Sequence, residues 1–231
     1  MSTYQREAQY IHLLSLKEHT VKELSEKLFV SEPTVRRDLR VLREKEILVT
    51  KHGNVSLKPS FSDRRIPLFI REQEQNAEKI KIALHAVSHI KDGDVIMLDA
   101  STTAYHLLPH LSTFKNIIII TNGAKTAIEA TAMGIKTFCT GGEMTSESYS
   151  YVGIDAENML RRYNADVAFF SCRGVSERGD ITDSSILENS VRRIMIANSK
   201  KSFVLCDKSK LGKTFIHTLC HKNELSGIIS D

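Results

Sequence analysis

The sequence predicts an α/β protein in two parts: a small helical domain that ends in a β-hairpin, and a larger domain with a mostly parallel sheet. Residues 1–57 hold short helical patterns followed by an alternating, hairpin-like pattern. Residues 76–231 hold six short, almost continuously apolar runs separated by helical segments. Such runs are typical of strands that are buried on both faces of a parallel sheet. Pro59 and Pro67 interrupt the pattern between the two parts, so residues 58–75 are predicted to be a linker.

The composition is that of a globular protein. The 231 residues include 41% hydrophobic and 26% charged residues, enough for one large domain or two smaller ones. No apolar run approaches the roughly 18 residues needed to cross a bilayer. The first residues are polar and lack the apolar core of a signal peptide. We therefore expect a cytoplasmic protein.

The positive charge is concentrated near the N-terminus. Residues 1–59 carry eleven Lys and Arg against eight Asp and Glu, an excess of three out of the net charge of +4. This uneven distribution points weakly to a polyanion as the partner of the first domain.

Neither a metal site nor a cofactor is expected. The four cysteines are widely spaced and contain no CxxC motif. The histidine pairs His85/His89 and His106/His110 have a spacing that can chelate zinc. Both pairs are nevertheless predicted to face solvent. His85 and His89 lie opposite the predicted buried residues Ile80, Ala83, Leu84 and Val87, and His106 and His110 lie opposite Ala104, Leu107, Leu108 and Leu111.

The first domain begins with three predicted helices. The first covers residues 3–16, and Thr20 with Glu23 forms a capping box that opens the second. Phe29 and Val30 form a short turn, after which Ser31 is a good N-cap for the third helix.

The third helix is predicted to have an apolar back and a basic front. Its back is the stripe of Val35, Leu39 and Leu42. At about 100° per residue, Pro33, Arg37 and Arg40 point away from this stripe, and Arg36 lies on the shoulder. Two short helices joined by a tight turn, the second with a basic outer face, form a helix-turn-helix unit.

The alternating pattern after this helix completes a winged helix-turn-helix. Residues 47–51 and 55–57 are predicted strands around the turn His52-Gly53-Asn54. In this arrangement the basic helix would enter a major groove, and Lys51 and His52 would lie near the phosphate backbone. The three arginines, Arg36, Arg37 and Arg40, would contact guanine edges or phosphates, and Thr34 would suit a phosphate oxygen.

In the larger domain, polar residues follow the predicted strands 95–99, 117–121, 137–140, 167–171, 203–207 and 227–230. The predicted helices are 76–90, 102–112, 123–133, 155–163 and 187–198. Open α/β sheets bind ligands at the carboxyl ends of their strands. The residues found there are Asp99 with Ser101, Thr102 and Thr103; Thr121 with Asn122; Gly141 with Gly142; and Asp207 with Lys208 and Lys210. Together these loops predict a pocket for a phosphorylated polyol.

The first domain resembles the DeoR family of bacterial transcription regulators. Residues 30–42, VSEPTVRRDLRVL, match that family's pattern VS-x-x-T-[IV]-RRDL-x-x-L, and the wing KHGN follows. Within the pattern, Asp38 is expected to orient an arginine or cap locally rather than to contact DNA.

The larger domain continues this resemblance. The family's sensor domain resembles ribose-5-phosphate isomerase and carries D-x-[GS]-[TS]-T, a TN pair, a GG pair and D-x-SKxG, which correspond here to residues 99–103, 121–122, 141–142 and 207–212. Glu188 and Arg192 fit the family's E-x-x-x-[KR]-R helix. The resemblance implies that Ser101, Thr102 and Thr103 hold a phosphate. It also implies that Asp99, Asn122 and Lys210 face hydroxyls or the phosphate.

Three hypotheses of function follow. We expect a DNA-binding repressor of a sugar operon, not an enzyme, that is controlled by a sugar phosphate and is a dimer or tetramer. The second is a sugar-phosphate isomerase with a nucleic-acid-binding appendage, using Asp99, Asp183, Glu188 or Lys210 as acid or base. The third is a winged-helix protein that recognises protein, whose affinity would depend little on salt.

Overall fold

The computed structural model describes residues 3–51, 53–58, 71 and 75–231. The chain divides between residues 74 and 75 into two compact units, and each has its own hydrophobic core. Most of the predicted linker, residues 58–75, falls outside the described residues, and so does His52 at the predicted wing tip. Within the described ranges, no helix is both long and apolar enough to cross a membrane.

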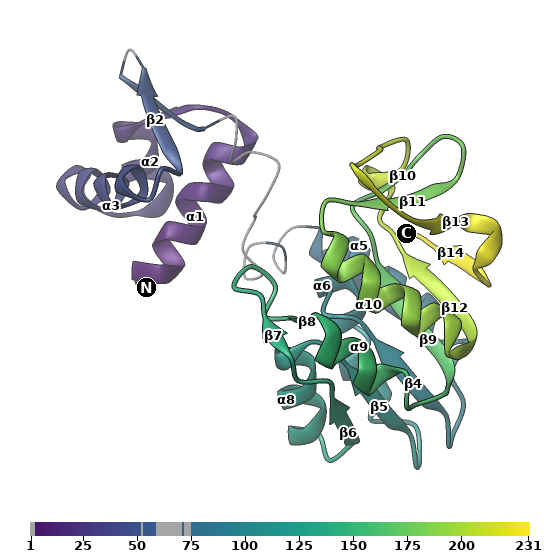
Figure 1. The fold of residues 1–231 in the computed structure, drawn as a ribbon. Coiled ribbons are helices and arrows are strands. Elements are labelled where there is room, and N and C mark those ends of the chain that lie inside the picture. Colours follow the sequence, from purple (N-terminus) through teal and green to yellow (C-terminus); the bar gives the residue numbers. More distant parts are fainter. Residues whose placement is uncertain (1–2, 52, 59–70, 72–74) are drawn as a thin grey trace. The chain divides into compact units, whose positions relative to one another are not determined.

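Three helices and a small antiparallel sheet form the first unit (Figure 1). The helices are α1 (Thr3–Leu16), α2 (Val21–Leu28) and α3 (Glu32–Glu44). Strands β2 (Leu48–Lys51) and β3 (Asn54–Leu57) form the predicted hairpin, and β1 (His19–Thr20) pairs with the other edge of β3. The predicted winged helix-turn-helix is confirmed.

The capping and turn residues explain where α2 and α3 begin. The backbone N–H of Glu23 donates to Thr20 Oγ1 at 3.2 Å, and Thr20 N–H donates to Glu23 Oε2 at 2.7 Å, so the predicted capping box is confirmed. Phe29 ends α2 in the left-handed region, with φ of +54°. Ser31 occupies the predicted N-cap position of α3, but its hydroxyl contacts Thr34 Oγ1 at 3.0 Å instead of capping a backbone N–H.

The second unit is built on a six-stranded parallel sheet. Its strands are β4 (Val95–Leu98), β5 (Ile118–Thr121), β6 (Lys136–Cys139), β9 (Ala165–Ser171), β12 (Ser199–Leu205) and β14 (Gly227–Ile229). They lie in the order β14-β12-β9-β4-β5-β6. All six predicted strands are confirmed, with ends displaced by a few residues, and the parallel pairing brings their carboxyl ends to one edge.

Helices cover both faces of this sheet (Figure 1). One face shares a core with α5 (Asn76–Val87), α6 (Thr102–Tyr105), α7 (Leu108–Leu111) and α8 (Ala124–Ala132). The other face packs against α9 (Ile154–Leu160) and α10 (Ile186–Ala197). The helix predicted over residues 102–112 is therefore two short helices, with Pro109 in the first turn of the second.

Two small antiparallel sheets were not predicted from the sequence. One consists of β10 (Gly174–Val175), β11 (Asp180–Asp183) and β13 (His217–His221), and the other of β7 (Glu143–Met144) and β8 (Tyr151–Val152). Strands of two to five residues are too short to show the alternation by which strands are recognised.

The predicted buried face of α5 is partly wrong. Ala83 is buried, but Ile80 and Leu84 are exposed, and Lys79, Ile82 and Ala86 are buried instead. Apolar residues occur all around this helix, so its sequence pattern does not select one face. Packing against the sheet selects the face that contains Ile82.

Candidate functional site

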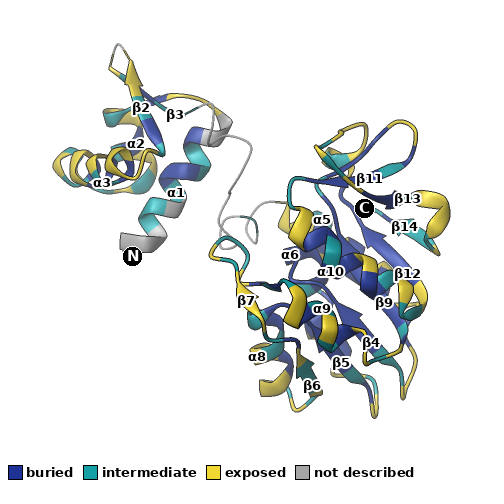
Figure 2. Cartoon of the chain, in the orientation of Figure 1, coloured by how far each residue is buried: buried dark blue, intermediate teal, exposed yellow. Residues whose placement is uncertain are grey.

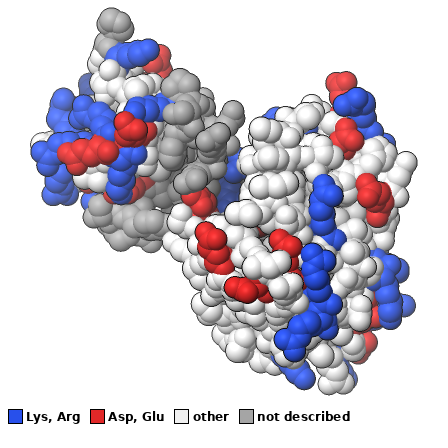
Figure 3. All heavy atoms as spheres, viewed as in Figure 1, with Lys and Arg blue, Asp and Glu red and all other residues white. Residues whose placement is uncertain are grey.

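The outer side of α3 is basic and accessible. Its back packs in the core through the predicted stripe of Val35, Leu39 and Leu42. The side chains of Arg36, Arg37 and Arg40 are 66%, 64% and 70% exposed. Figure 2 shows the outer face of α3 as exposed, and Figure 3 shows basic side chains gathered there with a few acidic ones among them.

Acidic neighbours on the same helix pair with two of these arginines. Arg36 Nη2 lies 3.2 Å from Glu32 Oε2, and Arg40 Nε lies 4.0 Å from Glu44 Oε1, each one turn apart. Exposed pairs at this spacing are worth only about 0.3–0.5 kcal/mol. Both arginines can therefore leave their carboxylates for a phosphate or a base edge at little cost.

Asp38 lies on the buried side of α3 and links this helix to α1. Arg6 Nε donates to Asp38 Oδ2 at 2.8 Å, and the Tyr10 hydroxyl lies 3.5 Å from the same oxygen. Burial and the Asp38 carboxylate raise the pKa of Tyr10 to about 12. The hydrogen bond to Asp38 also raises the pKa of Arg6. The expectation that Asp38 orients an arginine is met, although the best-placed arginine is Arg6 of α1.

The remaining predicted DNA-contacting residues lie at the start of α3 and in the wing. Ser31 and Pro33 are exposed, and Thr34 is half-buried. Lys51 is exposed at the end of β2, before the wing position His52, which lies outside the described residues. Their contact with DNA remains a prediction.

In the second unit, a buried arginine connects two aspartates at the carboxyl edge of the sheet. Arg192 Nε donates to Asp99 Oδ2 at 2.9 Å, and Arg192 Nη1 donates to Asp183 Oδ2 at 2.8 Å. Asp99 also accepts the backbone N–H groups of Ser171 at 3.2 Å and Ser101 at 3.1 Å. The ends of β4 and β9 are thus fastened to α10.

These contacts favour the charged forms of Arg192 and Asp183. Burial alone would lower the pKa of Arg192, but the carboxylates of Asp183, Asp99 and Glu188 raise it above its ordinary value. Burial raises and the guanidinium of Arg192 lowers the pKa of Asp183, and the net shift is downward. Arg192, Asp99 and Asp183 therefore support the structure of the site.

Lys210 connects the loop after β12 to the same edge. It ends the short helix η1 (Lys208–Lys210), and its Nζ donates to Ser171 Oγ at 3.0 Å and lies 3.4 Å from Asp207 Oδ2. Burial opposes ionisation of Asp207, but Lys210 and hydrogen bonds from Ser209 lower its pKa. The loops after β4, β9 and β12 therefore form one connected cluster.

Asn122 and Glu188 flank a second cluster, centred on the segment 148–151. Asn122 Nδ2 donates to the carbonyl oxygen of Tyr151 at 3.0 Å. The hydroxyls of Ser148 and Ser150 both donate to Glu188 Oε1. Through these hydrogen bonds, the segment 148–151 links the end of β5 to the first turn of α10.

Several predicted hydroxyl groups already have local backbone partners. Ser101 Oγ accepts the N–H of Ala104 at 3.1 Å and so caps α6. Thr121 Oγ1 accepts the N–H of Gly123 at 3.0 Å. Thr102 and Thr103 are buried at the start of α6. Ligand contact by these residues stays a prediction.

The two glycines after β6 have different structural roles. Gly142 has φ of +105°, and a Cβ there would lie 2.9 Å from the carbonyl oxygen of Val152 and 3.1 Å from the N of Ala156. It is thus required by close packing against the start of α9. Gly141 has φ of +65°, and no described atom would lie within 4 Å of its Cβ. A side chain would therefore meet open space at Gly141 but not at Gly142.

Sequence reasoning did not assign Arg192, Ser171 or Ser150 a role in this site, and it named Asp183 only as an acid or base of the isomerase hypothesis. A charged residue in a helical pattern is expected to face solvent. The four-residue spacing of Glu188 and Arg192, which places both on one face of α10, was the available signal.

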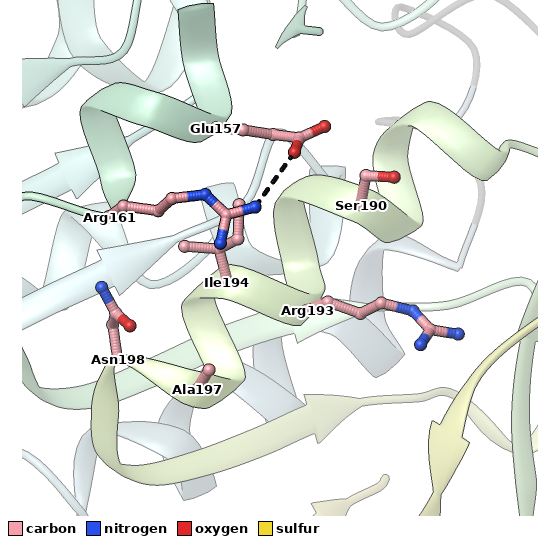
Figure 4. Close-up of a pocket in the computed structure, with 7 residues that line it drawn as sticks. All are labelled: Glu157, Arg161, Ser190, Arg193, Ile194, Ala197 and Asn198. Atoms are coloured by element: carbon pink, nitrogen blue, oxygen red, sulfur yellow. Dashed lines mark hydrogen bonds and ion pairs between the residues drawn. The ribbon is translucent and has the colours of Figure 1, made fainter. Parts of the chain in front are cut away.

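A pocket of about 320 Å³ lies elsewhere, between α9 and α10 (Figure 4). Glu157 and Arg161, 3.4 Å apart, line it together with Arg193, whose Nη2 donates to the carbonyl oxygen of Thr218. None of the predicted site residues lines this pocket. It is therefore not part of the candidate site.

The chain is similar to curated transcription regulators along nearly its whole length. It is 33% identical to the HTH-type transcriptional regulator GolR of Listeria innocua, covering 100% of this chain and 91% of that protein. It is 31% identical to the L-fucose operon activator of Escherichia coli, covering 95% and 90%. It is 32% identical to the lactose phosphotransferase system repressor of Staphylococcus aureus, covering 90% and 84%.

Solved structures are similar to the chain at lower sequence identity. A translation initiation factor eIF-2B from Pyrococcus horikoshii is 15% identical with a TM-score of 0.50, covering 97% of this chain and 86% of that one. A ribose 5-phosphate isomerase A from Methanocaldococcus jannaschii is 22% identical with a TM-score of 0.45, covering 60% and 55%.

Family matches cover both units. Residues 6–60 match the DeoR-like helix-turn-helix domain, and residues 74–231 match the DeoR C terminal sensor domain. A helix-turn-helix domain and a sensor domain imply a DNA partner and a small-molecule effector. The chain therefore belongs to the DeoR family, a family of transcription regulators and not of enzymes.

Proposed function

We propose that this protein represses a sugar-metabolism operon in the cytoplasm, and that a phosphorylated sugar bound in the second unit controls its binding to operator DNA. The domain assignment in this proposal is 1–57 for DNA binding, 58–75 for the linker and 76–231 for the sensor. The observation that carries it is the convergence of charged and hydroxyl side chains at the carboxyl ends of the sheet, in a chain that also has an exposed basic helix.

On the DNA side, α3 is the proposed reader. Arg37 and Arg40 lie on the outer face, and Arg36 lies beside them. Arginine forms bidentate bonds with guanine edges and phosphates. Ser31, Pro33 and Thr34 at the helix start would approach the groove, with Lys51 and His52 of the wing near the phosphate backbone.

On the ligand side, Lys210 is the proposed phosphate partner, together with Ser101, Thr102 and Thr103. The Nζ of Lys210 contacts Ser171 Oγ and Asp207, and the Lys210 side chain remains partly exposed. Asp99, Thr121, Asn122, Glu188, Gly141 and Gly142 would surround the sugar. An L-fucose operon activator and a lactose phosphotransferase system repressor among the relatives support a carbohydrate signal.

The ligand changes DNA affinity only if it binds two arrangements of the protein unequally. A typical coupling free energy is about 1–3 kcal/mol, or roughly a 5- to 150-fold change in affinity. A palindromic operator would require two copies of α3 related by a two-fold axis, so we propose a dimer or tetramer.

A calorimetric screen of sugar phosphates against the wild-type chain tests the ligand assignment. The hits are repeated with Lys210→Ala and Thr102→Val, and both variants are expected to bind more weakly. The control is Thr126→Val, which changes a buried threonine of α8 instead of α6. This variant should bind the sugar phosphate normally. If no sugar phosphate binds the wild type, or if both site variants bind as well as it does, the pocket is assigned wrongly.

A further inference from the structure

Two buried polar atoms at the ends of β5 and β6 have no hydrogen-bond partner in the described part of the chain. They are Asn122 Oδ1 and Thr140 Oγ1, on residues that are 0% and 8% exposed. The amide of Asn122 is oriented by its Nδ2, which donates to the carbonyl oxygen of Tyr151. A flipped amide would place its oxygen against that carbonyl, so Oδ1 is the free acceptor.

The two atoms belong to adjacent positions at the carboxyl edge of the sheet. Thr121 and Cys139 are opposite each other in the β5–β6 pairing, and the N–H of Thr140 donates to the carbonyl oxygen of Thr121 at 3.1 Å. The next residues, Asn122 and Thr140, are therefore neighbours. Asn122 contacts Tyr151, which packs with Ile120 and Phe138 in the core shared with α9 and α10.

A carboxylate lies beyond these acceptors. Ser150 pairs with Gly123, the residue after Asn122, and its hydroxyl donates to Glu188 Oε1. Glu188 is itself buried. This side of the site is therefore rich in hydrogen-bond acceptors, whereas Lys210 belongs to the loop after β12.

Unpaired buried acceptors lower the stability of a fold, so they need an explanation. Valine has nearly the shape of threonine, and it would fill the Thr140 position without an unpaired oxygen. The Thr140 hydroxyl gives the free protein no hydrogen bond among the described residues. A ligand that donates hydrogen bonds would account for both atoms.

We infer that Asn122 and Thr140 bind the hydroxyl end of the effector, and that the effector is consequently a sugar monophosphate and not a bisphosphate. The inference rests on the proposed function. A sugar hydroxyl can donate to Asn122 Oδ1 and to Thr140 Oγ1. A phosphate monoester, with a second pKa of about 6, is mostly a dianion at neutral pH and is a poor donor to Asn122. A second phosphate at this end would also be repelled by Glu188.

Titration calorimetry with matched ligands tests this inference. The probes are fructose 6-phosphate, tagatose 6-phosphate and glucitol 6-phosphate, the 1,6-bisphosphates of the two ketoses, and inorganic phosphate. We expect monophosphate binding to the wild type and at least tenfold weaker binding of the matching bisphosphate. Thr140→Val should weaken monophosphate binding about five- to tenfold, as for one neutral hydrogen bond, and leave phosphate binding unchanged.

Thermal unfolding separates this role from a structural one. Thr140→Val should not lower the melting temperature, because no hydrogen bond among the described residues is lost. Thr137→Val on the same strand loses the bond from Thr137 Oγ1 to the carbonyl oxygen of Ile135, at 2.9 Å. That control should melt earlier and bind the monophosphate normally.

The outcomes are distinguishable. If the wild type binds a bisphosphate as tightly as its monophosphate, or if Thr140→Val binds the monophosphate normally, this inference is wrong and the proposed function stands. If no sugar phosphate binds the wild type, the proposed effector class and this inference fail together.

Discussion

The ion pair between Arg6 and Asp38 should determine how firmly α3 is held. Arg6→Met leaves the Asp38 carboxylate, whose side chain is 3% exposed, without its partner at 2.8 Å. Charges about 4 Å apart interact by about 4 kcal/mol at an effective dielectric constant of about 20. Breaking a buried pair by removing one partner typically costs about 3–5 kcal/mol. Arg37 lies 3.8 Å from Asp38 and can compensate in part, so we expect about 3 kcal/mol.

A loss of this size is large for a unit of this length. At about 0.05–0.15 kcal/mol per residue, a domain of about 55 residues is stable by only about 3–8 kcal/mol. Hydrogen–deuterium exchange of the α3 amides in the full chain measures the change directly. Arg6→Met should accelerate exchange roughly a hundredfold, since about 1.4 kcal/mol corresponds to a factor of ten.

Two comparisons make this prediction refutable. Arg40→Met removes an exposed pair on the same helix and should change exchange less than about threefold. The double variant Arg6→Met/Asp38→Leu should recover much of the loss, because no buried charge remains unpaired. If Arg6→Met exchanges like Arg40→Met, the buried pair does not hold α3.

Two further predictions concern DNA binding and acid stability. Arg37→Ala should weaken DNA binding and reduce the slope of log K against log salt by about one, measured by fluorescence anisotropy; an unchanged slope would exclude a phosphate contact by Arg37. The lowered pKa values of Asp183 and Asp207 mean that the folded state binds their protons less tightly than the unfolded state. Their contribution to stability is therefore complete above their ordinary pKa of 3.8 and is lost as the pH falls below it. Asp207→Asn should lose stability less steeply with acid in urea titrations, and an equal slope would contradict this assignment.

The elements predicted best were those with strong local signals. The central strands, such as residues 118–121, are buried on both faces and therefore appear as continuous apolar runs. The capping box of Thr20 and Glu23 is likewise a local pattern, and it marked the start of α2 correctly. The face of α5 depended on tertiary packing, so the exposure of Ile80 was missed.

The residues of the candidate site also fall into those that the sequence pattern predicts and those that depend on tertiary packing. Loops that follow strands could be predicted to share one edge, because parallel strands end together. The supporting role of Arg192 could not be predicted, since its burial depends on two aspartates, 9 and 93 positions away along the chain. That Thr140 Oγ1 has no hydrogen-bond partner among the described residues also depends on packing, so it could not be predicted from the sequence.

The central claim is that a sugar phosphate in the second unit controls DNA binding by α3. The most direct test recovers bound DNA from a random-sequence pool, then measures the affinity of the full chain for the recovered site with and without the sugar phosphate found by calorimetry. We predict an enriched inverted repeat and at least a fivefold change in affinity. We also predict that DNA changes the affinity for the sugar phosphate by the same factor. Sugar phosphate binding that leaves the affinity for the recovered DNA unchanged would contradict the account.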